Sequence, residues 1–179
     1  MYIQEHMRRV LFSLLLVAGV GLALRFTSPA AETSADFGGK KITIKYHAPS
    51  LHGRDVFGPN GPIRKDPTYP VWRAGANAAT LLHTDADLDI NGMNVPKGDY
   101  TLFVLPDEGN WQLIVNKQTG QWGLSYNQSM DLGRVPMRMS KPSSPIETFK
   151  ITLDKSGADK GTLTLEWAEY VATVPFTVK

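Results

Sequence analysis

The chain has 179 residues, of which 42% are apolar and 20% charged, as in one ordinary globular domain; this composition excludes a wholly disordered polymer. The formal net charge is only +2 and the basic residues are not clustered, which excludes nucleic acid as an expected partner. The absence of cysteine excludes disulfides, thiolate metal ligands, cysteine nucleophiles and a lipid-modified cysteine.

The first segment of the chain has the features of a secretory signal peptide. The basic pair Arg8-Arg9 precedes an apolar run over residues 10–24, and small residues at 28–30 or 33–35 would suit signal peptidase. The apolar run is shorter than the roughly 20 residues that a membrane-spanning helix needs. An uncleaved signal segment that tethers the protein to the membrane is the alternative.

We therefore predict that residues 1–35 are a signal peptide with a short linker and that residues 36–179 form one domain. Removing the first 35 residues takes away three arginines and two glutamates, which leaves 16 basic and 15 acidic side chains, a net charge of +1. The expected location is the periplasm or the outside of the cell, with no stable membrane insertion after cleavage.

Alternation of apolar and polar residues, the period of a half-buried strand, begins at Lys41. Asn91-Gly92 separates two short alternating segments and predicts a tight hairpin, because both residues tolerate positive φ. The segment 100–105 is apolar on both faces, which is typical of a central strand. The other strands are expected at 41–46, 88–90, 93–95, 111–115, 147–153, 162–167 and 171–178.

Eight or nine short strands, no amphipathic helix after the signal and no internal repeat predict an all-β fold. We expect a single antiparallel β-sandwich, with a jelly-roll-like topology as one form of it and a closed barrel as the alternative. The segment from His47 to Ala79 lacks alternation and is predicted to be one long irregular loop. Loops of this length in compact domains are usually functional or disordered, and the aromatic residues of this loop argue against disorder.

Polar side chains of this loop could converge on an anionic or hydroxyl-rich ligand, because the arginine fork makes paired hydrogen bonds to such groups. In the alternative interpretation Arg54 or Arg73 pairs with Asp55 or Asp131 and only fixes the loop. Flat indole rings also suit sugar rings: Trp122 lies in a turn-like setting and is the best exposed candidate, whereas Trp111 and Trp167 begin or lie in apolar strands. The predicted ligand-binding residues are Arg54, Asp55, Trp72, Arg73, Asn77, Thr80, Trp122 and Arg134.

Two boxes in the loop carry a family resemblance. Gly-Arg-Asp-Val-Phe-Gly at 53–58 and Trp-Arg-Ala-Gly-Ala-Asn at 72–77 resemble a bacterial family known only as a domain of unknown function. The similarity continues to Val174-Pro175-Phe176 and covers nearly all of the domain. It implies an exported β-rich protein without an established activity. His47-Ala48 departs from the Ser-Arg of the family pattern, so one arginine is missing here.

Catalytic and metal signals are weak. There is no Gly-x-Ser-x-Gly elbow around Ser50 or Ser125, and the weak catalytic candidates are His52 or His83 with Asp55. The candidates for metal ligands, His47, His52 and His83, do not follow a known spacing, and no cofactor is expected. Asp85, Asp87 and Asp89 are interpreted as one face of a strand, either its solvated side or a weak calcium site.

These signals favour a non-enzymatic binding or structural domain of the cell envelope, with a small molecule or an envelope glycan as its partner. The alternative is a hydrolase of envelope polymers or small esters that uses a His/Asp pair, with or without a metal. A binding domain predicts arginines paired within the loop. A hydrolase predicts a pocket where His, Asp and Arg side chains meet.

Overall fold

The computed structural model describes residues 28–107 and 109–179, so the predicted signal sequence up to residue 27 lies outside the described residues. Within the described ranges, no helix is long and apolar enough to cross a membrane. The secondary structure is almost entirely β. Its elements are β1 (Ala30–Phe37), β2 (Lys40–His47), β3 (Thr80–Thr84), β4 (Leu88–Ile90), β5 (Met93–Val95), β6 (Gly98–Leu105), β7 (Gln112–Asn116), the 3-10 helix η1 (Gln128–Met130), β8 (Asp131–Pro136), β9 (Arg138–Ser140), β10 (Ile146–Lys155), β11 (Lys160–Ala168) and β12 (Tyr170–Val178).

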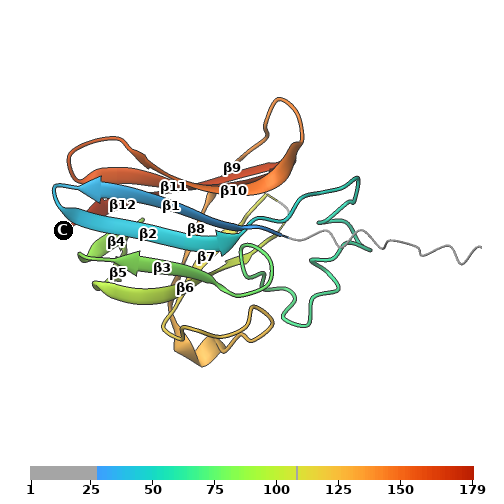
Figure 1. Cartoon of the computed structure of the whole chain (residues 1–179), viewed down its shortest axis with the longest axis horizontal. Helices are drawn as coiled ribbons and strands as arrows, with labels where there is room; N and C mark the ends of the chain where they lie inside the picture. The colour runs from blue at the N-terminus through green and yellow to red at the C-terminus, as the bar shows by residue number, and fades with distance from the viewer. Residues whose placement is uncertain (1–27, 108) are drawn as a thin grey trace, which may run out of the picture.

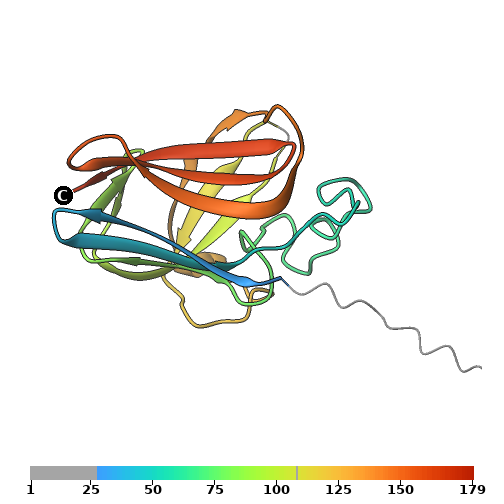
Figure 2. The same ribbon diagram turned by 45° about the horizontal axis from the view of Figure 1, so that its top comes forward.

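The strands form two antiparallel sheets that pack face to face (Figures 1 and 2). The first sheet has the order β1-β2-β3-β6-β7-β8, and the second has the order β10-β11-β12-β4-β5, with β9 paired to β12. The predicted antiparallel sandwich is confirmed, and the sheets do not close into a barrel. Most neighbouring strands are consecutive along the chain, unlike the interleaved strands of a jelly roll.

The strands with the strongest patterns form where they were expected. Strand β6 lies between β3 and β7, and its residues 100–104 are all buried, as a central strand requires. Asn91 and Gly92 adopt φ values of 49° and 91° in the turn between β4 and β5, which confirms the predicted hairpin.

Four strands, β1, β3, β8 and β9, have no clear pattern of their own. Strand β1 is an edge strand of small and polar residues that pairs with β2 along its whole length, from Ala30 opposite His47 to Phe37 opposite Lys40. Residues 30–35, which the sequence assigned to the linker, therefore belong to the sandwich. Pairing with a neighbouring strand supplies the order that the local sequence does not specify.

The core contains an aromatic cluster between the two sheets. Trp72 and Trp167 stack with their ring centroids 5.6 Å apart, and Phe149 packs on both indoles. Trp111 and Trp167 are each 3% exposed, which confirms that they are core residues. Because Trp72 belongs to the long loop, the cluster fixes part of that loop to the sandwich.

Candidate ligand-binding cleft

The long loop projects from one end of the two sheets (Figure 1) and is bonded to both of them. Near its start, Leu51 N–H donates to Glu147 O of β10 at 2.9 Å. Near its end, Trp72 and Val104 of β6 exchange two backbone hydrogen bonds of 2.7 Å each. The loop is thus held at both ends by backbone pairing, although it contains no regular strand.

The first box builds a compact turn. The guanidinium of Arg54 donates to Leu51 O at 2.9 Å and to Ser50 O at 2.7 Å, so it clamps its own loop. Asp55 Oδ1 accepts the N–H of Gly58 at 2.8 Å, and a side chain on Gly58 would collide with that carboxylate. Val56 is 1% exposed and anchors the turn in the core.

Phe57 follows this anchor and forms the floor of a cleft of about 510 Å³. Its ring contacts those of Trp111 and Tyr170, with centroids 5.2 and 5.0 Å away. Arg54 and Asp55 of the box line the cleft, and so do residues that the sequence did not single out. These are chiefly Arg64 of the same loop and Glu169 and Tyr170 at the turn between β11 and β12.

The cleft carries donors and acceptors around an aromatic floor. Among the described residues, neither Arg54 nor Arg64 has a carboxylate within ion-pair distance, and both side chains are exposed. Arg64 Nη1 donates to Tyr69 Oη at 3.0 Å, and its guanidinium lies 5.6 Å from the centroid of that ring. The two arginines can donate to a ligand, while the carboxylates of Asp55 and Glu169 can accept from it.

In the second box, the side chains of Trp72 and Arg73 make contacts within the fold. Trp72 is 1% exposed and donates from Nε1 to Gly75 O at 3.0 Å, so it cannot stack on a sugar. Arg73 Nη2 lies 2.7 Å from Asp66 Oδ2, and its partner is therefore neither Asp55 nor Asp131. Burial lowers the pKa of Arg73, and the carboxylate of Asp66 partly opposes that effect.

Two further predicted ligand residues also stabilise the loop. Thr80 is 0% exposed and donates from Oγ1 to Ala74 O at 2.7 Å. Asn77 has a φ of 59°, its carbonyl accepts the N–H of Gly123 at 3.1 Å, and its side-chain amide donates to Ser28 O at 3.5 Å. The Thr80 hydroxyl is thus occupied within the fold, whereas the Asn77 side chain is exposed and makes one long hydrogen bond.

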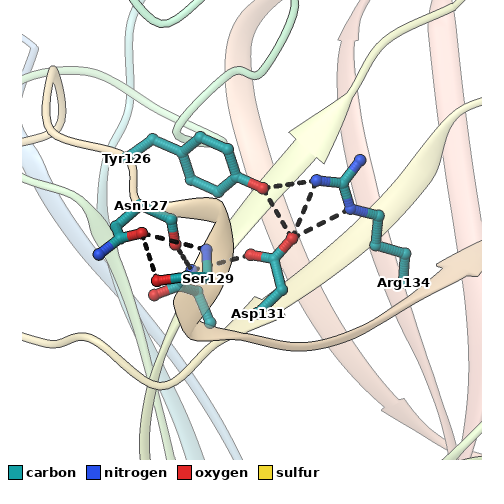
Figure 3. Close-up of polar contacts among 6 residues, drawn as sticks. Tyr126, Asn127, Ser129, Asp131 and Arg134 are labelled. Carbon is teal, nitrogen blue, oxygen red and sulfur yellow. Dashed lines mark hydrogen bonds and ion pairs between the residues drawn. The ribbon is translucent and has the colours of Figure 1, made fainter.

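Arg134 and Trp122 lie away from the cleft. Arg134 is paired in register with Ile114 on β7 and bonds Asp131 Oδ2 from Nε and Nη2, at 3.0 and 2.9 Å (Figure 3). Trp122 is 57% exposed, as predicted, and its backbone pairs with Ala78, so it lies beside the second box.

Tyr126 completes the hydrogen-bond network of Asp131 and Arg134. Its hydroxyl donates to Asp131 Oδ2 at 2.7 Å and accepts from Arg134 Nη2 at 2.6 Å (Figure 3). Burial, followed by the hydrogen bond to Asp131, raises the pKa of Tyr126 to about 12. Although burial alone would lower it, the bonds to Asp131 raise the pKa of Arg134. The network pins η1 and the start of β8, which is a structural role for Arg134.

The histidine candidates do not meet Asp55 in a catalytic arrangement. His83 Nδ1 lies 2.7 Å from Asp99 Oδ1, and His83 Nε2 lies 3.1 Å from Asp85 Oδ1. His52 does not line the cleft; its backbone N–H donates to Glu147 Oε1 at 2.9 Å. His47 closes β2. In the described part of the chain, no three His, Asp or Glu side chains are grouped as a metal site would require.

The three aspartates do not share one strand face, contrary to prediction. Asp85 lies between β3 and β4, and its Oδ2 accepts the N–H of Lys41 at 3.0 Å. Asp87 accepts the N–H of Lys97 at 2.8 Å, also outside the strands. Asp89 in β4 accepts the N–H of Gly92 at 2.7 Å. Each carboxylate stabilises a different turn.

A comparison with known protein families gave one match. A family model described as "Protein of unknown function (DUF2911)" matches residues 28–176. The chain belongs to this family. Searches of curated proteins and of solved structures found no match. The DUF2911 match spans both sheets and the long loop, and it confirms the expected membership of a family without an assigned function. The bacterial origin and the two boxes as a family signature stay predictions.

Proposed function

We propose that this DUF2911 protein is a non-enzymatic carbohydrate-binding domain of the cell envelope, with the cleft between Arg54 and Arg64 as its binding site. One observation carries the proposal. Two exposed arginines without ion-pair partners among the described residues and two carboxylates surround an aromatic floor in one cleft. Export rests on the N-terminal sequence.

The side chains of the cleft suit the chemistry of a sugar. Each sugar hydroxyl both donates and accepts hydrogen bonds, so a sugar can use Arg54 and Arg64 as donors and Asp55 and Glu169 as acceptors. The apolar C–H face of the ring can lie against the aromatic floor. A purely anionic ligand fits less well, because the two carboxylates oppose the attraction of the two arginines.

A binding role also agrees better with the surroundings than hydrolysis does. None of the histidines in the described part of the chain lines the cleft, and Asp55 Oδ1 is already bonded to the N–H of Gly58. His83 lies near the far end of β3 from the loop and is bonded to two other aspartates. These contacts favour binding over the His/Asp pair of the hydrolase alternative.

A glycan array tests the proposal. The full-length protein would be applied to neutral and acidic bacterial and plant oligosaccharides, with extended peptides screened in parallel. We expect binding to neutral or sparsely charged glycans and loss of at least about tenfold in affinity in Arg64→Gln, equivalent to about 1.4 kcal/mol. Arg138→Gln on β9 removes an exposed arginine elsewhere and is the matched control.

Three outcomes would overturn the carbohydrate-binding proposal. The first is binding to no glycan, or only to peptides. The second is equal binding by Arg64→Gln and the parent protein. The third is release of new reducing ends from a bound glycan, which would restore the hydrolase alternative. Cell fractionation tests the envelope location separately, since recovery of the protein from the cytosol alone would contradict export.

A further inference from the structure

The cleft has a neighbouring concavity on the side of Tyr69. This second concavity has a volume of about 320 Å³ and shares Phe57, Arg64 and Tyr170 with the cleft. Its far wall includes Tyr69, which is 41% exposed, together with Asp107 and Trp111. Because three side chains are common to both, the two spaces adjoin without an intervening wall of other residues.

A third concavity borders the cleft and is lined by residues of the loop alone. It has a volume of about 370 Å³ and shares Arg54, Asp55 and Pro59 with the cleft. Its remaining walls come from residues 60–62. The three spaces thus form one run of concave surface, which we call the groove, with Arg64 at one junction and Arg54 at the other.

We infer that the groove binds a linear glycan chain of at least three sugar units rather than a single sugar; this inference rests on the proposed function. Each of the three spaces has a volume near the lower end of the range for small-molecule sites, about 300–1,000 Å³. A single ring would fill one of them. Because neighbouring spaces border on common side chains, successive units of one chain can occupy them in turn.

The distribution of side chains along the groove supports a chain of neutral or sparsely charged units. Carboxylates of Asp55, Glu169 and Asp107 line the groove together with the two arginines, so a ligand with a charge of one sign on every unit would meet repulsion as well as attraction. Hydroxyls along a glycan find both donors and acceptors. Tyr69 offers a partly exposed ring at the end of the second space.

An extended peptide is a weaker fit. Peptides that bind to β-proteins commonly add a strand to an open sheet edge and use its backbone groups. The walls of the groove come from loops and from the ends of β11 and β12, so no strand edge runs along it. Side chains, and not a row of backbone donors and acceptors, would make the contacts.

A length series tests the inference. Chito-, cello- and galacturono-oligosaccharides of one, two and four units would be titrated calorimetrically into the full-length protein. In the chito- or the cello-series, affinity is expected to rise at least about tenfold between one and four units, equivalent to about 1.4 kcal/mol, whereas the galacturono-series, which is charged on every unit, should bind more weakly. Tyr69→Ala should weaken binding of the tetramer more than binding of the monomer. Tyr69→Phe keeps the ring and loses only the hydroxyl that accepts from Arg64, so it should weaken the tetramer less than Tyr69→Ala does.

A second pair of variants tests the third concavity, at the other end of the groove. Asn60→Trp would fill part of the third space and should also weaken binding of the tetramer alone. Trp122→Ala removes an exposed indole outside the groove and should leave every affinity unchanged. A midpoint temperature of thermal unfolding equal to that of the parent protein shows in each case that the variant is folded.

The two proposals fail differently. The groove inference is wrong, and the single-site proposal stands, under three joint conditions. A sugar binds, Arg64→Gln weakens that binding, and affinity does not depend on length in any series. If affinity depends on length but neither Tyr69→Ala nor Asn60→Trp reduces it, the chain lies elsewhere and the inference is also wrong. If no sugar binds at all, both proposals are wrong.

Discussion

The rings of Phe57 and Tyr170 meet edge to face, with centroids 5.0 Å apart and an interplanar angle of 76°. This contact joins the long loop to the first residue of β12, and both side chains line the proposed binding cleft. Phe57 also packs against Trp72 and Trp167 of the core. One set of aromatic contacts therefore holds the loop and forms the floor of the site, which makes the floor rigid before any ligand arrives.

Trp72→Ala should destabilise the protein by about 3–5 kcal/mol, because it leaves a large cavity in the aromatic cluster. Trp122→Ala should change stability by no more than about 0.5 kcal/mol, since that indole is mostly exposed. Chemical denaturation of both variants checks the pair. Equal stabilities would contradict the assignment of Trp72 to the core.

Arg73→Ala should cost about 3 kcal/mol, because the carboxylate of Asp66, whose side chain is 5% exposed, would lose its charged partner. Lys45→Ala breaks the exposed pair with Glu32 and should cost less than about 1 kcal/mol. The free energies of unfolding of both variants give the comparison. A loss of glycan binding by Arg73→Ala without a loss of stability would instead place Arg73 in the site.

His83 should titrate above its ordinary pKa of 6.5, because its hydrogen bonds to Asp99 and then Asp85 favour the imidazolium and outweigh slight burial. Because the pKa of His83 is higher in the folded state, the protonated imidazole stabilises the fold. This stabilisation is fully present below pH 6.5 and is lost as the pH rises through the folded-state pKa. Because His83 is about half exposed, solvent screening keeps the stability effect small.

An NMR titration of the imidazole C–H signals measures this pKa directly. Asp99→Asn should lower the pKa of His83 toward the ordinary value, since the hydrogen bond of His83 to residue 99 is then no longer with a charged group. Asp159→Asn, at the exposed turn before β11, is the control and should leave the His83 titration unchanged. A His83 pKa that is the same in Asp99→Asn and the parent protein would contradict the assigned pairing.

Gly61→Ala should destabilise the loop and weaken glycan binding together. A Cβ at Gly61 would lie 2.5 Å from the carbonyl oxygens of Asp55 and Val56, so the backbone beside the cleft has to shift. Gly157→Ala is the matched control, because its Cβ would make only ordinary contacts of 3.6 Å or more. Thermal unfolding and the glycan titration of both variants are the measurements. Normal binding by Gly61→Ala would show that the cleft does not depend on this close approach.

Much of the sandwich could be predicted because its strongest strands carry their own signal. Strand β6 is apolar on both faces and can only be central, and Asn91-Gly92 dictates a tight turn through its backbone preferences. Strand β1 has neither property. Its order comes from hairpin pairing with β2 across Gly38-Gly39, while its mostly small and polar residues give no apolar alternation in the sequence.

The candidate site was predicted in part. The loop and the pair Arg54-Asp55 were identified because an irregular, motif-rich segment on a β-sandwich is where binding residues gather. Arg64 lay in the same loop without a distinguishing pattern. Glu169 and Tyr170 form a turn more than 100 residues further along the chain, so only the packing of that turn against the loop reveals them.

By itself, the sequence determined the β class, the absence of thiol chemistry and the position of the long loop, because these follow from composition and local periodicity. Only the tertiary structure decided which polar residues of that loop face solvent. Arg54 and Arg73 have the same side chain in similar boxes, yet one lines the cleft and the other is buried against Asp66. Burial and partners are properties of the whole fold, and they separate a binding residue from a structural one.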